Sequence, residues 1–115
     1  MAHTALVFEI SRIVEMPAFT RRVTTLLHDD DYRQFQLTIL RRPTLGRVIQ
    51  GTGGLRKVRW DASGRGKRGG VRIIYYWAKP QEEILMLFIY GKDEQDDLTP
   101  SQRRQLRTIV ETEYP

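Results

Sequence analysis

Two different periods of hydrophobic residues follow each other in the first part of the chain. Residues 5–10 alternate, with Leu6, Phe8 and Ile10 on one side, and this period of two predicts a strand. From Pro17, which suits the first position of a helix, the period lengthens. Apolar residues then recur at helical spacing: Phe19, Val23, Leu26 and Leu27. They form one stripe, which predicts a first helix.

A second helix is predicted directly after the first. Asp29 or Asp30 can cap its N-terminus, because a carboxylate accepts hydrogen bonds from the free backbone N–H groups there. Its apolar residues are Tyr32, Phe35, Ile39 and Leu40. Pro43 ends the helix, since proline disfavours helical geometry in the residue before it. We expect the two helices to form a hairpin.

Beyond Gly46 the sequence becomes typical of a sheet. Residues 55–60, 71–78 and 84–90 are rich in β-branched and aromatic side chains, which favours three strands. The turn at residues 79–82 is short, so the second and third strands are predicted to form an antiparallel hairpin. Together the three strands predict a meander.

A last helix is indicated by the sequence around Thr99. Pro100 follows Thr99, and Gln102 stands three residues after it, which is the pattern of a capped helix start. The buried stripe consists of Leu106, Ile109 and Val110. The helix should end near Glu113. The order β-α-α-β-β-β-α predicts a single domain over residues 1–115 of the α+β class, with helices on a mostly antiparallel four-stranded sheet. The order of the strands stays open.

Composition excludes several classes of protein. The chain has 40% hydrophobic and 10% aromatic residues, enough to build a core rather than remain disordered. It has no cysteine, which excludes a disulfide scaffold, an iron–sulfur cluster and a cysteine-based zinc site, and suits the cytoplasm. No apolar stretch approaches the roughly 18 residues that cross a bilayer. Residues 1–10 contain Glu9 and no basic region before their apolar run, so no signal peptide is expected.

The net charge of +5 is distributed unevenly along the chain. Residues 41–72 hold ten basic side chains and one acid, Asp61, so this segment carries +9 and the remainder −4. A basic segment with aromatic residues in and next to it favours a polyanionic partner, because phosphate neutralisation supplies most of the sequence-independent affinity for nucleic acid. The alternative is a basic face that is merely solvated.

Several short segments in roughly the last two thirds of the chain resemble one known family. They are Leu45-Gly46, Val48-Ile49-Gln50-Gly51-Thr52-Gly53-Gly54-Leu55-Arg56-Lys57-Val58-Arg59, Gly66-Lys67-Arg68-Gly69-Gly70, Arg72-Ile73-Ile74-Tyr75-Tyr76, Ile89-Tyr90-Gly91-Lys92 and Asp97-Leu98. In this order and spacing they resemble the HigB-type branch of the RelE/ParE toxin superfamily. The resemblance implies a RelE-like fold and a bacterial toxin that is paired with a neutralising antitoxin.

The resemblance also implies an activity and a set of partners. It implies a ribosome-dependent endoribonuclease that enters the decoding site of the small ribosomal subunit and cuts messenger RNA, with no metal and no cofactor. The expected partners are the ribosome, messenger RNA and a cognate antitoxin of the helix-turn-helix type, and no membrane is expected.

Metal-free RNA cleavage places demands on the side chains of the site. The ribose 2′-OH attacks the adjacent phosphorus, so a base, an acid and a stabiliser of the charge on the phosphoryl oxygens are needed. Strand alternation puts Lys57 and Arg59 on one face, where both can point at a phosphate. These two match the paired basic positions of the RelE motif, and Arg72 matches the arginine of its next strand. All three are candidate catalytic residues; the alternative is that they only guard an exposed sheet face.

Four more basic residues are candidates for binding RNA: Arg56, Arg65, Lys67 and Arg68. The last three belong to the glycine-flanked loop at residues 64–70, whose backbone can approach a nucleic-acid strand. The loop lacks the spacing of a nucleotide-binding P-loop. A charged, solvated hairpin turn is the alternative.

The segment after the last predicted strand matches the family incompletely. Lys92 matches a basic residue and is a candidate contact to phosphate in the transition state. Asp93 and Thr99 stand where RelE itself has a second basic residue and a catalytic tyrosine, so the proton-transfer groups stay open. Glu94 is the nearest candidate acid or base, unless it is solvated or complements the N-terminus of the last helix.

A metal site is not indicated. His3 and His28 lie far apart in the sequence, cysteine is absent, and the basic segment opposes a site made of carboxylates alone. The strand aromatics are expected mainly in the core, with stacking on a base open to one of them. They are Trp60, Tyr75, Tyr76 and Trp77.

Two other functions compete with RNA cleavage. A ParE-like topoisomerase poison should dispense with the strand pair Lys57 and Arg59 and with Arg72, which this chain has. A non-catalytic RNA-binding or ribosome-associated module would use the same cations, because phosphate binding and phosphate chemistry need the same side chains.

Overall fold

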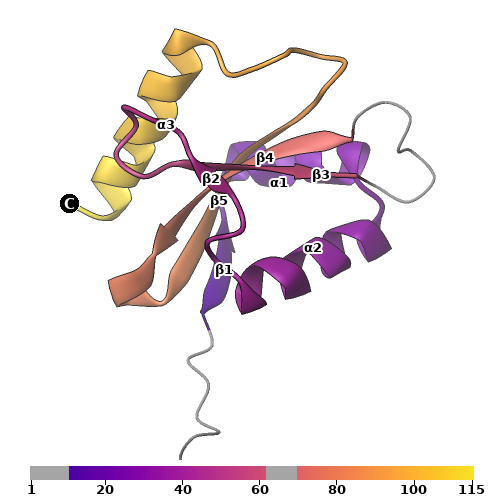
Figure 1. The fold of residues 1–115 in the computed structure, drawn as a ribbon, viewed down its shortest axis with the longest axis horizontal. Helices are drawn as coiled ribbons and strands as arrows, with labels where there is room; N and C mark the ends of the chain where they lie inside the picture. The colour runs from indigo at the N-terminus through magenta and orange to yellow at the C-terminus, as the bar shows by residue number, and fades with distance from the viewer. Residues whose placement is uncertain (1–10, 62–69) are drawn as a thin grey trace, which may run out of the picture.

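The computed structural model describes residues 11–61 and 70–115, and they form one sheet flanked by helices (Figure 1). The sheet has five strands in the order β1-β5-β4-β3-β2. β1 runs parallel to β5, and the other neighbours are antiparallel. The expected α+β class and mostly antiparallel sheet are confirmed, and the described residues contain five strands where four were predicted for the whole chain.

The first strand, β1, spans Arg12–Glu15. The strand predicted over residues 5–10 lies outside the described residues, and no pattern in the sequence predicted a strand at Arg12–Glu15. This short segment has only two apolar residues, so its extended shape depends on pairing with Glu83–Met86 of β5. The Arg12 guanidinium also binds the carboxylate of Glu83 across the pair.

Both predicted helices of the first half are confirmed. α1 spans Pro17–Leu26 with proline at its start, and α2 spans Asp29–Arg41 and ends before Pro43. The predicted cap of α2 is wrong, because His28 occupies the N-cap position and makes no side-chain capping bond. Three aspartates occupy the first turn instead, where their negative charge complements the helix dipole.

The strands of the second half are β2 (Arg47–Val48), β3 (Arg56–Trp60), β4 (Val71–Ala78) and β5 (Glu83–Gly91). The meander of β3, β4 and β5 is confirmed, whereas the two-residue β2 was not predicted. The β4–β5 hairpin turns through the 3-10 helix η3 (Lys79–Gln81) and through Glu82, whose φ is 55°. A bulge in β5 leaves Leu87 without a register partner between Met86 and Phe88.

Each face of the sheet carries its own core. On one face, α1 and α2 contribute five buried residues: Phe19, Val23, Leu27, Phe35 and Ile39. On the other face lies α3 (Pro100–Glu113), which contributes Leu106 and Val110. Figure 1 shows α3 and α2 on opposite sides of the sheet.

The predicted start of α3 is confirmed in detail. The Thr99 hydroxyl accepts a hydrogen bond from the Gln102 N–H at 3.1 Å, and the Gln102 side chain accepts one from the Thr99 N–H at 2.9 Å. No helix in the described part of the chain is long and apolar enough to cross a membrane.

Candidate active site

The three candidate catalytic cations lie together on the α3 face of the sheet. Arg59 of β3 stands directly opposite Arg72 of β4, and Lys57 is the next residue of β3 on the same face. All three line an open hollow of about 500 Å³, together with Leu45, Arg47 and Val58. Like charges directly opposite each other destabilise a sheet, and an anion bound between them would offset this repulsion.

Arg59 has an acidic neighbour in Asp61, which directly follows the end of β3. Its Nε lies 3.3 Å from Oδ1 of Asp61, and 58% of the Arg59 side chain is exposed. An exposed pair of this kind is weak, because water and salt screen it. The guanidinium therefore stays accessible to a stronger anion.

A carboxylate from the loop before α3 joins Lys57, which lines the hollow, to an arginine of α3. Asp97 Oδ1 accepts hydrogen bonds from Lys57 Nζ at 3.1 Å and from the Leu98 N–H at 2.8 Å. Its Oδ2 accepts one from Nη2 of Arg103, on α3, at 3.2 Å. Partial burial acts to raise the pKa of Asp97, but these hydrogen bonds and the two positive charges outweigh it and lower that pKa. Asp97 is therefore ionised at neutral pH.

Tyr90 of β5 lies beside the same cations. It stands opposite Arg72 across the β4–β5 pair, and its side chain is fully buried. Its hydroxyl oxygen has no hydrogen-bond partner among the residues that the structure describes. Burial and the charge of Asp97 raise the pKa of Tyr90, against Arg72 and Arg103, which act to lower it. The hydroxyl is therefore a neutral, buried group under the charged cluster.

Lys92 and Glu94 are held outside the hollow. Lys92 Nζ lies 3.0 Å from Oδ1 of the exposed Asp96. Glu94 binds Arg22 of α1, whose Nη2 lies 2.7 Å from both carboxylate oxygens, and it accepts the Gly91 N–H at 2.8 Å. The Gly91 hydrogen bond and then Arg22 lower the pKa of Glu94. Neither Lys92 nor Glu94 therefore lines the hollow.

Arg22 explains why Glu94 is held at α1. β1 pairs with only the first half of β5, and α1 follows the open edge beyond it. Arg22 Nε donates to the carbonyl of Ile89 at 2.8 Å, and its guanidinium lies 5.1 Å from the centre of the Phe88 ring. Arg22 therefore satisfies the free edge of β5, and Glu94 neutralises its charge.

Of the four candidate RNA-binding residues, only Arg56 belongs to the part of the chain that the structure describes. Arg65, Lys67 and Arg68 lie outside the described residues. Arg56 belongs to the other face of β3, and its Nη1 donates to the carbonyl of Gly46 at 2.7 Å. It therefore supports the chain that leads into β2.

The strand aromatics make contacts within the protein. Trp60 packs edge-on against Phe35, Tyr76 stacks on Tyr114, and Trp77 lies near Lys79. Tyr75 is fully buried. His28 occupies the N-cap position of α2 without a side-chain capping bond, and His3 lies outside the described residues. The described residues contain no group of three or more side chains that could hold a metal ion.

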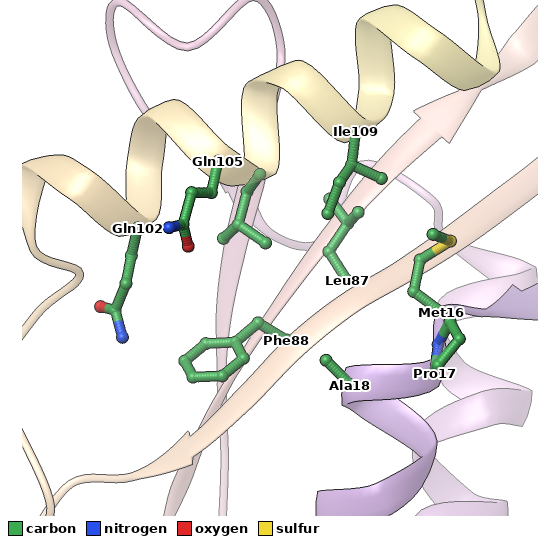
Figure 2. Close-up of a pocket in the computed structure, with 9 residues that line it drawn as sticks. Met16, Pro17, Ala18, Leu87, Phe88, Gln102, Gln105 and Ile109 are labelled. Atoms are coloured by element: carbon green, nitrogen blue, oxygen red, sulfur yellow. The ribbon is translucent and has the colours of Figure 1, made fainter.

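A second hollow, of about 260 Å³, lies between α3 and the start of α1 (Figure 2). Phe88 and Leu87 form its floor, and Gln102, Gln105 and Ile109 reach toward it from α3. Its lining residues carry no charge, so it offers no cation to neutralise a phosphate.

Sequence reasoning missed Tyr90, Asp97 and Arg103. The register that starts at the turn of residues 79–82 would place Ile89 opposite Arg72, and the bulge at Leu87 shifts the pairing by one residue to Tyr90, so the turn alone did not predict this neighbour. Asp97 stands 40 positions from Lys57 and meets it only because α3 packs back on the sheet. No local pattern marks this contact.

Comparison with known proteins supports the fold. No known protein-family profile matches the chain. A variant of the Escherichia coli toxin RelE in its free state superposes with a TM-score of 0.60 at 11% identity, covering 84% of this chain and 96% of RelE. The intact E. coli RelBE toxin–antitoxin complex matches with a TM-score of 0.56 at 10% identity, over 70% of this chain and 95% of that chain. The chain therefore has the fold of RelE, which its sequence motifs implied.

Proposed function

We propose that this protein is the toxin of a type II toxin–antitoxin pair, of the HigB branch, and a ribosome-dependent endoribonuclease of the cytoplasm. The observation that carries the proposal is the group of Lys57, Arg59 and Arg72 on one exposed face of the sheet. The sequence motifs and the similarity to RelE support it.

In the proposed reaction, the 2′-OH of one nucleotide attacks the adjacent phosphorus and the 5′ oxygen leaves. Lys57, Arg59 and Arg72 bind the phosphoryl oxygens, whose negative charge grows in the transition state. A guanidinium suits this role because it stays charged and can donate two parallel hydrogen bonds. This chemistry needs no metal, because three side-chain cations supply the positive charge.

Orientation by the ribosome supplies much of the rate. Lys and Arg titrate far above neutral pH and are poor bases there. Glu94, the sequence candidate for proton transfer, is bound to Arg22. Messenger RNA held with its 2′-OH in line with the leaving oxygen can gain roughly 7–11 kcal/mol from orientation alone. The exposed Lys92 and the basic residues at 64–70 would hold the RNA backbone around the site.

The antitoxin is expected to use the same charges. It would cover the face around Lys57, Arg59 and Arg72 with an acidic or amphipathic segment, or hold the toxin where it cannot fit the ribosome. A complex that leaves this face bare would favour the second mode.

Expression in bacteria tests the proposal. The wild-type chain should arrest growth and translation, and Arg72→Ala should abolish the arrest with a normal circular dichroism spectrum. Arg33→Ala, at an exposed position of α2, is the matched control and should remain toxic. Normal growth while intact wild-type protein accumulates would contradict the proposal, and full toxicity of a folded Arg72→Ala protein would remove Arg72 from the mechanism.

Cleavage in a purified translation system separates the competing functions. Translated messenger RNA should be cut in the presence of a chelator at a concentration that keeps ribosomes assembled, and naked RNA should be cut little or not at all. Attack by the 2′-OH leaves a 5′-hydroxyl end, which the mapping of products detects. Translation blocked without cuts would indicate a non-catalytic module, and arrest with intact translation and damaged DNA would indicate a topoisomerase poison.

A further inference from the structure

Asp97 connects α3 to the cations of the sheet. Its two carboxylate oxygens bind Lys57 Nζ at 3.1 Å and Arg103 Nη2 at 3.2 Å, so one small group holds a strand lysine beside a helix arginine. We propose that Arg103 is a further RNA-phosphate ligand of this site, and that Asp97 is the positioning residue that holds Arg103 and Lys57 side by side. The inference rests on the function proposed above.

Arg103 shares its surroundings with Arg72. Arg103 is joined through Asp97 to Lys57, and its charge, like that of Arg72, acts to lower the pKa of the buried Tyr90 hydroxyl. Arg72 approaches from β4 and Arg103 from α3, on the same face of the sheet. Arg103 is thus a further cation beside the hollow, joined to Lys57 through Asp97, in addition to the four basic residues that line the hollow itself.

Both cations keep donors for a phosphate while Asp97 holds them. A lysine ammonium has three donors and a guanidinium five, and Asp97 takes one hydrogen bond from each. About a third of each side chain is exposed, 33% for Lys57 and 38% for Arg103. The remaining N–H groups can therefore reach an RNA oxygen without breaking the contact to Asp97.

The backbone of Asp97 is fixed, so its carboxylate is a rigid support. Gln95 Nε2 donates to the Asp97 carbonyl at 2.7 Å and to Oε1 of Gln102 at 2.9 Å. The next residue, Leu98, is buried in the core under α3, and Thr99 caps that helix. A carboxylate anchored on both sides orients two flexible cations before RNA arrives, which preorganises the site.

Salt-dependent binding tests Arg103. Fluorescence anisotropy with a short 2′-O-methyl RNA, which lacks the attacking hydroxyl, measures affinity without cleavage. Arg103→Ala should weaken binding and reduce the slope of log K against log salt by about 0.7, the value for one phosphate contact on a single strand. The matched control is Arg104→Ala, which removes the same charge from the neighbouring, exposed position of α3 and should leave the slope at the wild-type value.

Three results would overturn the assignment of Arg103. The first is a salt slope in Arg103→Ala that equals the wild-type slope. The second is an equal reduction of the slope in Arg104→Ala, which would indicate an effect of net charge alone. The third is wild-type binding that does not depend on salt. The outcome is separable from that of the proposed function. Wild-type protein that binds the oligonucleotide yet never cuts RNA on the ribosome refutes nuclease activity and leaves the phosphate contact of Arg103 standing.

Cleavage kinetics test the positioning role of Asp97. In the translation system Asp97→Asn should lower kcat by about tenfold, because misplaced catalytic groups slow a reaction, while KM stays the same or falls as a negative charge is lost. Asp97→Glu should restore part of kcat. In a protein that already carries Arg103→Ala, Asp97→Asn should lower kcat by a smaller factor than it does in the wild type, since the two residues act as a unit.

Glu111→Gln is the control for loss of a carboxylate on the same side of the protein. Glu111 pairs with Arg107 on α3, and its neutral variant should keep both kinetic parameters. Full or increased kcat with tighter RNA binding in Asp97→Asn would overturn the proposal, because Asp97 would then compete with the phosphate. A purely structural role would lower stability in parallel with activity and would show no coupling to Arg103.

Discussion

Two buried tyrosines of the sheet, Tyr75 and Tyr90, differ in the hydrogen bonds of their hydroxyl groups, and replacing each by phenylalanine tests this difference. The Tyr75 hydroxyl donates to the carbonyl of Pro43 at 2.7 Å and accepts the N–H of Gly46 at 2.8 Å. The Tyr90 hydroxyl has no hydrogen-bond partner among the described residues. Both rings are fully buried, so replacement by phenylalanine removes only the oxygen in each case.

The expected costs follow from these partners. Tyr75→Phe leaves the buried N–H of Gly46 unsatisfied, at about 1–3 kcal/mol, and also loses the hydrogen bond to the carbonyl of the half-buried Pro43. We expect a loss of about 2–3 kcal/mol of unfolding free energy. Tyr90→Phe removes a polar atom that is buried without compensation, so stability should stay constant or rise by about 1 kcal/mol.

Equilibrium unfolding in urea measures both effects. With a slope of about 2 kcal/mol per molar urea, Tyr75→Phe should lower the midpoint by about 1 M, and Tyr90→Phe should leave it unchanged or raise it by up to about 0.5 M. A loss of more than about 1 kcal/mol in Tyr90→Phe would refute the assignment of an unpartnered hydroxyl. Neutral behaviour of Tyr75→Phe would show that the segment before β2, which carries Leu45 and Arg47 to the hollow, does not depend on this oxygen.

Three more predictions concern stability. Because the folded chain lowers the pKa of Glu94, the ionised carboxylate stabilises the fold at pH values above its pKa in the unfolded chain. This stabilisation is lost as the pH falls through the lower pKa of the folded chain. Glu94→Gln should therefore flatten the acid side of a plot of melting temperature against pH. Gly70→Ala should cost more than about 2 kcal/mol in urea unfolding, since φ is +66° there and a Cβ would overlap the carbonyl oxygen of Trp60; a neutral result would contradict this conformation. Thr99→Ala should cost about 1 kcal/mol and Thr99→Ser much less, because only the alanine variant loses the capping hydroxyl of α3.

The periodic segments of the chain were predictable because their causes are local. The apolar stripes of α1, α2 and α3 and the Thr99 cap depend on residues within one or two turns, and the structure has all of these features. The β-rich runs predicted the meander for the same reason. Alternation along β3 also placed Lys57 and Arg59 on one face, since successive side chains of a strand point to opposite sides.

The remaining features depend on contacts between distant segments. β1 and β2 are too short to carry a periodic signal, and each is a strand only because a neighbour in the sheet pairs with it. Register alone sets Arg59 opposite Arg72, because the length of the β3–β4 connection does not determine pairing.

The division of the acidic residues shows the same limit most clearly. Glu94 and Asp97 stand three positions apart in one polar loop, and nothing in their local sequence distinguishes them. In the folded chain Glu94 binds Arg22 at the edge of β5, whereas Asp97 binds Lys57 and Arg103 beside the hollow. A short-range pattern determines which residues share a face, whereas the partner of a charged side chain is determined by which elements the folded chain brings within a few ångströms of it.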